Sequence, residues 1–593
     1  MHRYRLKRGV WLAPRRAQGG ISFLLTPLSE GSRPLQRIPI ILAMLLVLAG
    51  SGRAVVAQVE TPIPSAPATP IATPQTAVQP DLAGVAPLPL SGERRTTFEA
   101  YVADAIDRFG VPGASIAVVQ AGEVVYAQGF GVKAFDGTDP VTADTLMMIG
   151  SVTKSMTATM AATVVDDGWL SWDTPVVELL PQFAVADPQL TPRLTVADAF
   201  CACTGLPRRD LELFFHFDDL TPARLIAQMA ELPLTAPFGE QFQYSNQMFA
   251  VGGYAAAAAA GAAPNDLYGG YQLVMRERLL NPIGMDRSTF ALADVLADGD
   301  YAVGHATDLD GTLQRVPVPV DERFVTAVAP AGALWSSARE MARYLQTELA
   351  NGVAPDGTRV VSAENLAGTW APRVAIPPEP GLPTLFSVTG NHYAMGWVVD
   401  TYQGQPVLSH TGGTLGFVSE VAFLPEADLG IVILANGGQG AAAFNFSVQF
   451  RLLELLFDQP TAFDAMLDQF LETQTAQVDE FRAQLGSVDP AVVAPYLGRY
   501  EHPALGEIEL ALRGGTLVLD GGEIRSEMRP RVDEAGQVVG YVFADSPLVG
   551  PTPVTLRQSD DGRPEVVVTV AGEAEETYVF TFLGTDLPPT PAP

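Results

Sequence analysis

The stretch "IGSVTKSMTATMAATVVDDGW" (residues 149–169) places Ser151 three positions before Lys154, at the head of a long apolar run that reads as a helix. The chain has three lysines, Lys7, Lys133 and Lys154, against 33 arginines. A guanidinium keeps its charge, whereas a partly buried ammonium can be driven to the neutral amine. A lysine kept in this apolar stretch therefore indicates a task that requires the loss of a proton.

Positions three apart share one face of a helix, so Ser151 and Lys154 can touch. A lysine that shares a proton with a serine hydroxyl is one way to activate a weak nucleophile. The pattern SxxK alone recurs by chance, but the competing hydrolase patterns GxSxG, HExxH and paired CxxC are missing from the sequence. None of the six histidines lies in a recognisable serine-triad context.

Two later motifs can complete a site around this pair. The segment "FQYSNQMF" carries Tyr244 and Asn246, and the segment "LSHTGGTLGF" carries His410, Thr411, Gly412 and Gly413. Taken singly, Tyr244 could be a core phenol, Asn246 a helix cap, and "HTGG" a glycine turn. Three motifs in series favour a common role over three unrelated structural ones.

The N-terminus has the pattern of an export signal. Residues 1–57 hold nine Lys/Arg and one acid, and the apolar run "IPIILAMLLVLAG" (38–50) is too short for a comfortable membrane span. We expect export with cleavage near Ala57, the alternative being an uncleaved anchor. Ser51 stands where a lipid-accepting cysteine would have to be, which excludes lipidation there.

Without residues 1–57 the chain carries a net charge of −38, from 27 basic and 65 acidic side chains. Such a surface repels nucleic acid and anionic lipid. We therefore expect small-molecule substrates, no nucleic-acid partner, and membrane contact only through the N-terminal segment.

The only cysteines, Cys201 and Cys203, are separated by one residue. Side chains two apart on a helix point to different sides, and a bridge across one residue would be strained. The sequence favours two buried free thiols, with a tight redox pair as the alternative. Two sulfurs with no nearby histidine make a poor zinc site.

The organisation of the chain follows from its periodicity. Residues 58–92 contain eight prolines and read as an extended tether. Within 93–457, a helix is expected at 94–109, one hairpin turns at Ala121-Gly122, and a second spans 418–437. Strands at both ends with helices between them predict one α/β sheet made from both ends of this segment, with an inserted helical part.

Residues 458–489 are expected to form a linker that contains a helix at 463–486. The alternation from 490 to 585, with Gly-Gly and Asp561-Gly562 turns, predicts a small antiparallel β-domain, closed or nearly so. Residues 586–593 read as a disordered tail.

Residues 93–457 resemble the serine β-lactamase-related family, which includes class C β-lactamases, D-alanyl-D-alanine carboxypeptidases, D-aminopeptidases and carboxylesterases. The matching segments are "IGSVTKSMTA", "DTPVVELLP", "TGLP", "FQYSNQMFAVGGY", "NPIGM", "PAGALWSSAREMARYL" and "HTGG". Residues 490–585, opened by "YLGRYE", resemble the lipocalin-like β-domain often attached to such enzymes. The implied fold is a β-lactamase/DD-peptidase-like antiparallel sheet with a helical subdomain, followed by a barrel-like β-domain.

The resemblance also implies roles for individual residues. Ser151 would be the acylated nucleophile, Lys154 its proton partner, and Tyr244 a general base or relay. Asn246 would hold a substrate amide, and the N–H groups of Ser151 and Gly413 would form the oxyanion hole. These groups would lie in a concave site between the helical subdomain and the sheet, with no metal or organic cofactor.

The sequence departs from the family pattern at three positions, and the third bears on the substrate. Ala202 takes the histidine position of the "HTSGLP" turn, Phe238 replaces a common proline, and His410 stands where β-lactamases carry the lysine of Lys-Thr-Gly. An ordinary imidazole is mostly neutral at pH 7, so recognition of a substrate carboxylate would improve only as the pH falls and His410 gains a proton.

The sequence thus predicts an exported serine hydrolase that acts through an acyl-enzyme on Ser151, with small ester, amide or peptide substrates preferred to β-lactams. The alternatives are a true β-lactamase or D-Ala-D-Ala carboxypeptidase, and a non-catalytic binding or sensing protein that keeps the fold.

Overall fold

The computed structural model describes residues 81–585, except for 378–390, 439, 546–549 and 571–575. The expected export signal, residues 58–80 of the expected tether, and the C-terminal tail lie outside the described residues.

The central sheet is built from the two ends of the hydrolase segment, as the sequence predicts. Its strand order is β2-β1-β12-β11-β10-β9-β8-β7, with every pairing antiparallel. The strands are β1 (Gly113–Gln120), β2 (Glu123–Gly131), β7 (Val374–Ala375), β8 (His392–Tyr393), β9 (Val398–Tyr402), β10 (Gln405–Gly413), β11 (Val418–Leu424) and β12 (Leu429–Ala435). Both predicted hairpins are confirmed, and β1 joins them by pairing Ala114 with Ala435.

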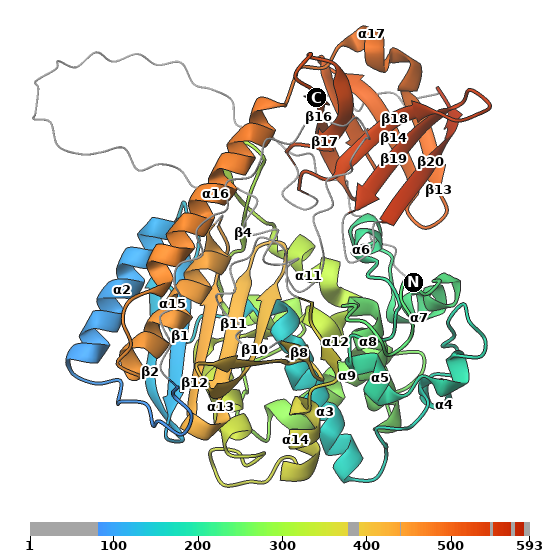
Figure 1. Cartoon of the computed structure of the whole chain (residues 1–593). Helices are drawn as coiled ribbons and strands as arrows, with labels where there is room; N and C mark the ends of the chain where they lie inside the picture. The colour runs from blue at the N-terminus through green and yellow to red at the C-terminus, as the bar shows by residue number, and fades with distance from the viewer. Residues whose placement is uncertain (1–80, 378–390, 439, 546–549, 571–575, 586–593) are drawn as a thin grey trace, which may run out of the picture. The chain divides into compact units, whose positions relative to one another are not determined.

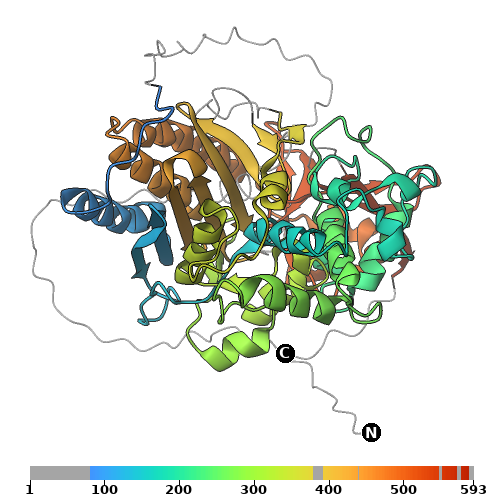
Figure 2. The ribbon, with the colours of Figure 1, turned by 90° about the horizontal axis from the view of Figure 1, so that it is seen from below.

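Helices cover both faces of this sheet (Figures 1 and 2). On one face, α2 (Glu93–Phe109) and α15 (Ala441–Leu456) pack together over side chains such as Ile116 and Ile433. On the other face, α13 (Ala338–Leu349) contacts β1 and β12, and the core extends into the inserted helices. Almost every residue of β1 and β12 is buried. Because successive side chains of a strand point to opposite faces of the sheet, these two strands contribute to the cores on both faces.

The inserted helical part runs from β2 to β7. Its other helices are α3 (Thr153–Asp166), α4 (Val176–Leu179), α5 (Val196–Phe200), α6 (Asp210–Phe215), α7 (Pro222–Gln228), α8 (Asn246–Ala259), α9 (Leu267–Met275), α10 (Leu292–Asp298), α11 (Val318–Thr326), α12 (Ala329–Gly332) and α14 (Ala363–Trp370). Helix α3 is buried from Thr153 to Val164 and is contacted by α8, α12 and α14. Its burial on all sides fits a sequence made mostly of alanine, valine, methionine, serine and threonine, in which buried hydroxyls such as those of Ser155 and Thr157 donate to backbone carbonyls.

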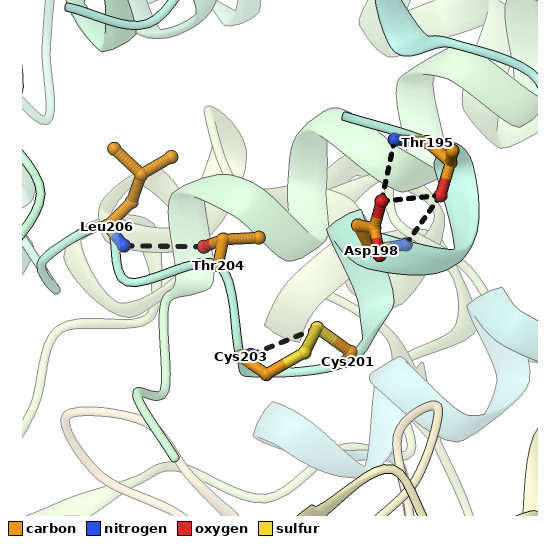
Figure 3. The surroundings of a disulfide bond; sticks show 6 residues. All are labelled: Thr195, Asp198, Cys201, Cys203, Thr204 and Leu206. Atoms are coloured by element: carbon orange, nitrogen blue, oxygen red, sulfur yellow. Dashed lines mark hydrogen bonds between the residues drawn. A yellow bond between two sulfur atoms is a disulfide. The ribbon is translucent and has the colours of Figure 1, made fainter. Parts of the chain in front are cut away.

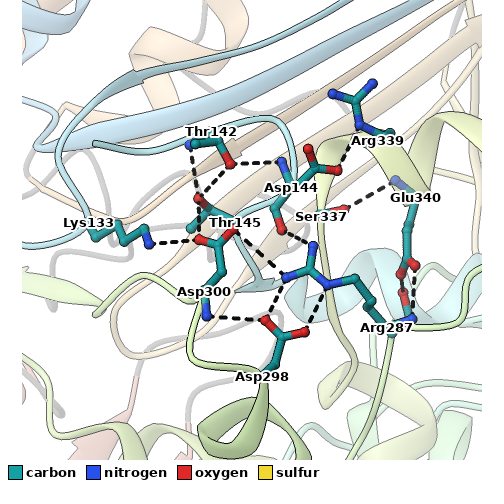
Figure 4. Close-up of polar contacts among 11 residues, drawn as sticks. Lys133, Thr142, Asp144, Thr145, Arg287, Asp298, Asp300, Ser337, Arg339 and Glu340 are labelled. Carbon is teal, nitrogen blue, oxygen red and sulfur yellow. Dashed lines mark hydrogen bonds and ion pairs between the residues drawn. The ribbon is translucent and has the colours of Figure 1, made fainter. Parts of the chain in front are cut away.

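A polar network ties the segment after β2 to the region around α10 and α13 (Figure 4). Lys133 pairs with Asp300 at 2.8 Å, and Asp300 also accepts a hydrogen bond from Thr145. Arg287 donates to Asp298 and to the carbonyl of Asp144. Lys133 therefore makes an ordinary, half-buried ion pair that an arginine could also make.

Residues 81–91, expected to belong to the tether, instead pack on the hydrolase domain. Leu82 and Leu90 are 4% exposed, and the Leu82 N–H donates to the Gln403 carbonyl. The Leu88 N–H donates to the Leu456 carbonyl. These contacts make residues 82–90 part of the folded hydrolase domain, which the sequence predicted to begin at residue 93.

The expected linker helix is α16 (Phe463–Ala483), and the C-terminal β-domain is a closed eight-stranded barrel in sequence order. Its strands are β13 (Gly498–His502), β14 (Gly506–Arg513), β15 (Thr516–Asp520), β16 (Arg525–Val532), β17 (Val538–Phe543), β18 (Pro553–Gln558), β19 (Pro564–Val570) and β20 (Glu576–Gly584). Its apolar core includes Leu211 and Phe215 of α6, and all described residues fall in one compact unit. Among the described residues, no helix combines the length and hydropathy that a membrane span needs.

Candidate active site

The candidate nucleophile lies at a tight entry into α3. Gly150 has φ +49°, and residues Gly150–Val152 form a 3₁₀ turn that continues into α3 at Thr153. A Cβ at Gly150 would lie 2.6 Å from the Gly413 nitrogen, and a Cβ at Gly412 would lie 2.0 Å from the Ile149 carbonyl oxygen. Glycine at both positions lets the end of β10 approach the backbone beside Ser151.

Lys154 is 1% exposed, and its Nζ contacts three oxygen atoms. Ser151 Oγ lies at 3.0 Å, Asn246 Oδ1 at 2.7 Å and the Ala331 carbonyl oxygen at 2.7 Å. Burial, and after it the positive charge of Arg208, lowers the pKa of Lys154 well below its ordinary value, while Asp210 acts in the opposite direction. The structure thus brings Ser151 and Lys154 together and favours the neutral amine.

The "YSN" motif lies on the other side of Lys154. Ser245, rather than Asn246, is the N-cap of α8, since its Oγ accepts from the Met248 N–H. Asn246 is therefore free of the capping role and reaches both Lys154 and Asp210. The ring of Tyr244 has its centroid 4.7 Å from Lys154 Nζ and is 6% exposed.

His410 does not provide a cation. It is 4% exposed, its Nδ1 donates to the Thr411 carbonyl at 2.6 Å, and its Nε2 accepts from the Tyr393 hydroxyl at 3.0 Å. Burial lowers the pKa of His410 to about 3. The expectation that His410 gains a proton as the pH falls toward the mildly acidic range is therefore wrong, because its surroundings are arranged for the neutral ring.

Thr411 and His410 occupy opposite faces of β10. In the ladder with β11, His410 pairs with Val421 and Thr411 pairs with Glu420. Alternation sends the Thr411 side chain to the face opposite that of His410. Within the "HTGG" motif, the backbone of Gly412 and Gly413 lies against Ile149 and Gly150, and the neutral imidazole of His410 lies beside Tyr393 and Tyr244.

The two cysteines form a disulfide, which corrects the expectation of free thiols (Figure 3). Helix α5, started by a capping box between Thr195 and Asp198, ends at Phe200, and Ala202 then adopts φ +50°. Cys201 and Cys203 thus lie on a tight turn, with 5.2 Å between their Cα atoms, a normal separation for a disulfide. The helical geometry assumed from the sequence does not apply to this pair.

The disulfide turn supports the loop that carries Tyr244. The Ala202 carbonyl accepts from the Gln243 N–H at 2.7 Å, and the Cys203 carbonyl accepts from the Gly239 N–H at 2.8 Å. Both cysteines pack in one apolar cluster with Tyr244 and Tyr393. A small pocket lies between this turn, the helical part and β8, lined by residues that include Lys154, Ala199, Ala202, Thr204, Tyr244 and Tyr393.

Sequence reasoning missed three residues of this site: Arg208, Asp210 and Tyr393. Arg208 and Asp210 follow the matched "TGLP" segment. Two opposite charges next to a family motif could have indicated that both residues belong to the site. Tyr393 lies on the two-residue strand β8, for which the sequence has no clear periodicity. Only the folded chain brings its hydroxyl to His410.

The chain is similar to several known proteins. The family model described as Beta-lactamase matches residues 98–454. The chain is 28% identical over 435 residues to unguisins hydrolase ungD' of Aspergillus campestris (strain IBT 28561), covering 70% of this chain and 77% of that protein. It is 28% identical over 397 residues to penicillin-binding protein 4 of Amycolatopsis lactamdurans, covering 66% and 93%.

A similar fold is found in the octameric penicillin-binding protein homologue from Pyrococcus abyssi, with a TM-score of 0.54 and 22% identity over 82% of this chain and 99% of that one. The match to the family model spans more than half of the sequence. From the sheet, the inserted helices and this match together, the chain belongs to the β-lactamase family of hydrolases.

Proposed function

We propose that the protein is a serine hydrolase that forms an acyl-enzyme on Ser151 with small ester, amide or peptide substrates. The observation that carries the proposal is the set of three oxygen atoms around Lys154 Nζ. A neutral amine has two hydrogens and one lone pair. Asn246 Oδ1 and the Ala331 carbonyl can only accept, so they take the two hydrogens and leave the lone pair directed at the Ser151 hydroxyl.

In the acylation step, Ser151 Oγ attacks the substrate carbonyl while its proton passes to Lys154. The Oγ–C bond forms, and the tetrahedral oxyanion is stabilised by the N–H groups of Ser151 and Gly413. The C–O or C–N bond to the leaving group then breaks, and the leaving group takes a proton delivered from Lys154, with Tyr244 as relay. Water releases the acyl group by the reverse sequence of proton transfers.

The preference for uncharged substrates rests on the third motif. A β-lactam or a D-Ala-D-Ala peptide carries a carboxylate, and the neutral His410 offers it no fixed charge. Arg208, whose positive charge acts on Lys154, is already paired with Asp210. We therefore favour neutral esters and amides, with true β-lactamase or D-Ala-D-Ala carboxypeptidase activity as the alternative.

The experiment is labelling with a fluorophosphonate, followed by peptide mass mapping, with Ser151→Ala as the matched control. We expect one modified serine, Ser151, in the folded protein and none in the variant. Label at another serine, or no label at all, would favour a binding or sensing protein. Turnover of an aryl ester, a D-amino-acid amide and a chromogenic cephalosporin then separates the substrate classes.

We also propose that the protein works outside the cytoplasm. The basic and apolar N-terminal pattern supports this, and so does the Cys201–Cys203 disulfide, since such bonds persist mainly in oxidising compartments.

A further inference from the structure

Arg208 and Asp210 form an ion pair at the rim of the site. Arg208 Nε donates to Asp210 Oδ2 at 2.5 Å, and the two side chains are 22% and 19% exposed. The Arg208 guanidinium lies 5.2 Å from the centroid of the Tyr244 ring. The pair thus contacts two residues of the site, Tyr244 and Asn246.

Asp210 is also bound to the amide of Asn246. Asn246 Nδ2 lies 3.0 Å from both Asp210 Oδ1 and Oδ2. A carboxylate only accepts hydrogen bonds, so the NH₂ end of the amide must face Asp210 and the carbonyl end must face Lys154. Reversing the amide would set its oxygen against a carboxylate and its NH₂ group against the Lys154 amine.

A continuous chain of contacts therefore runs from Arg208 through Asp210, Asn246 and Lys154 to Ser151. We propose that the Arg208–Asp210 pair is a positioning device that fixes the Asn246 amide, directs the Lys154 lone pair to Ser151, and sets with its two opposite charges the pH at which the amine becomes free. This inference rests on the proposed function, and it assigns to the two residues a role that acts through Asn246 and Lys154.

The charges of the pair oppose each other at Lys154. The positive charge of Arg208 lowers the Lys154 pKa and the negative charge of Asp210 raises it. Other titratable groups near Lys154 include the phenols of Tyr244 and Tyr393 and the neutral imidazole of His410. Removing one member of the pair should therefore move the Lys154 pKa in one direction, and removing the other should move it in the opposite direction.

The test measures the second-order rate of Ser151 labelling by a fluorophosphonate between pH 5 and 10. In this step the Oγ–P bond forms, fluoride leaves, and the hydroxyl proton passes to the amine. The labelling rate should therefore rise with pH as Lys154 loses its proton, and this rising part of the pH–rate profile, its acidic limb, gives the pH at which the amine becomes free. We expect Asp210→Asn to shift this limb by about 0.5 to 1 pH unit to lower pH, and Arg208→Gln to shift it by a similar amount to higher pH. The double variant should fall close to the wild type.

Matched controls change the same charges elsewhere. Arg209→Gln removes the next positive charge in the chain, which pairs with Glu576 and Glu212, and Asp219→Asn removes an acid that pairs with Arg224. Both should leave the limb in place. Asp210→Glu keeps the charge and should retain the wild-type limb even if the altered length slows labelling.

Three outcomes count against the inference. Limbs that stay fixed in both variants, or that move in the same direction, overturn it and leave the acyl-enzyme proposal standing, because Ser151 is still labelled. Absence of Ser151 labelling in the folded wild type overturns the proposed function and the inference together. If Asp210→Asn does not fold, Arg208→Gln alone still decides, since an unshifted or lower limb contradicts the proposal.

Discussion

Lys154 is surrounded by atoms that accept hydrogen bonds, and this arrangement determines which substitutions it can tolerate. The Ala331 carbonyl and Asn246 Oδ1 would both suit a cation, but burial makes the charged form costly. A guanidinium would satisfy the acceptors without ever offering a lone pair. Replacing Lys154 with arginine therefore separates the effect of a positive charge from the effect of proton transfer.

We expect Lys154→Arg to lose activity almost as completely as Lys154→Ala, by roughly two to four orders of magnitude in kcat. The measurement is kcat for a neutral aryl ester, with circular dichroism as the check on folding. Near-normal turnover in the arginine variant would show that Lys154 is only an electrostatic support.

His410 gives a second prediction at the residue scale. Because its pKa is lowered to about 3, the ring stays neutral from pH 5 to 8. The ratio of kcat/KM for a cephalosporin to that for an aryl ester should not rise through protonation of His410 in this range. His410→Lys should raise the ratio about tenfold, the effect of one charge-assisted hydrogen bond.

His410→Gln is the matched control, since it keeps a neutral hydrogen-bonding side chain. If the wild type already turns over the cephalosporin as well as the ester, or if His410→Lys leaves the ratio unchanged, the argument from the third motif is wrong.

The sequence predicted these residues unevenly, for physical reasons. The contact between Ser151 and Lys154 could be predicted from helix periodicity, because residues three positions apart lie on the same face of a helix. The scarcity of lysine was a weaker guide, since Lys133 makes a plain ion pair with Asp300. The low pKa of His410 depends mainly on burial, which no local pattern encodes.

The tight turn between α5 and the "TGLP" segment matters at the scale of elements. Ala202 has a positive φ, which costs a non-glycine residue about 1–2 kcal/mol. The disulfide across this turn offsets that cost by restricting the unfolded chain, by about 1–2 kcal/mol for so short a loop. The carbonyls of Ala202 and Cys203 then hold the segment that leads to Tyr244.

We expect Cys201→Ser/Cys203→Ser to lower Tm by a few degrees and to slow Ser151 labelling several-fold. Adding Ala202→Gly should recover part of both losses, because glycine adopts this backbone conformation without strain. A reductant should reproduce the effect in the wild type and have none in the serine variant. Unchanged labelling in all these proteins would show that the turn does not support the site.

Regular elements were predictable where the pattern was local. The hairpins at Ala121-Gly122 and at 418–437 follow from alternation and turn residues, and α16 follows from its helical spacing. The cysteine pair was misjudged because the end of α5 could not be located to within one residue. The packing of residues 81–91 was missed because it depends on contacts with Gln403 and Leu456, more than 300 residues away.

At the scale of the whole molecule, the barrel and the hydrolase domain share contacts at α6. Leu211 and Phe215 belong to the barrel core, and Arg209 pairs with Glu576 at 3.5 Å. Helix α6 begins at Asp210, so the barrel contacts lie next to the residues that hold Asn246. The sheet, in contrast, is complete at Ala435.

Deletion of residues 487–593 should therefore leave a folded hydrolase domain that is still labelled at Ser151, at a rate reduced about tenfold. The reduction follows from exposing Leu211 and Phe215 and loosening α6. Glu576→Gln in the full chain removes only the ion pair with Arg209, so it should reduce the labelling rate less than the deletion does. A truncated protein that folds and labels at the full rate would show that the barrel gives α6 no support.

The pairing of β1 with β12 joins residue 114 to residue 435, so the central sheet cannot be completed until most of the chain has been synthesised. Contacts this distant in sequence are slow to form. While the ribosome is still making the inserted helices, β1 and β2 have only each other as partners. A nascent chain that ends before β12 therefore carries Ser151 and Lys154 beside a sheet whose two ends are not yet joined, so we expect Ser151 labelling to appear only late in synthesis.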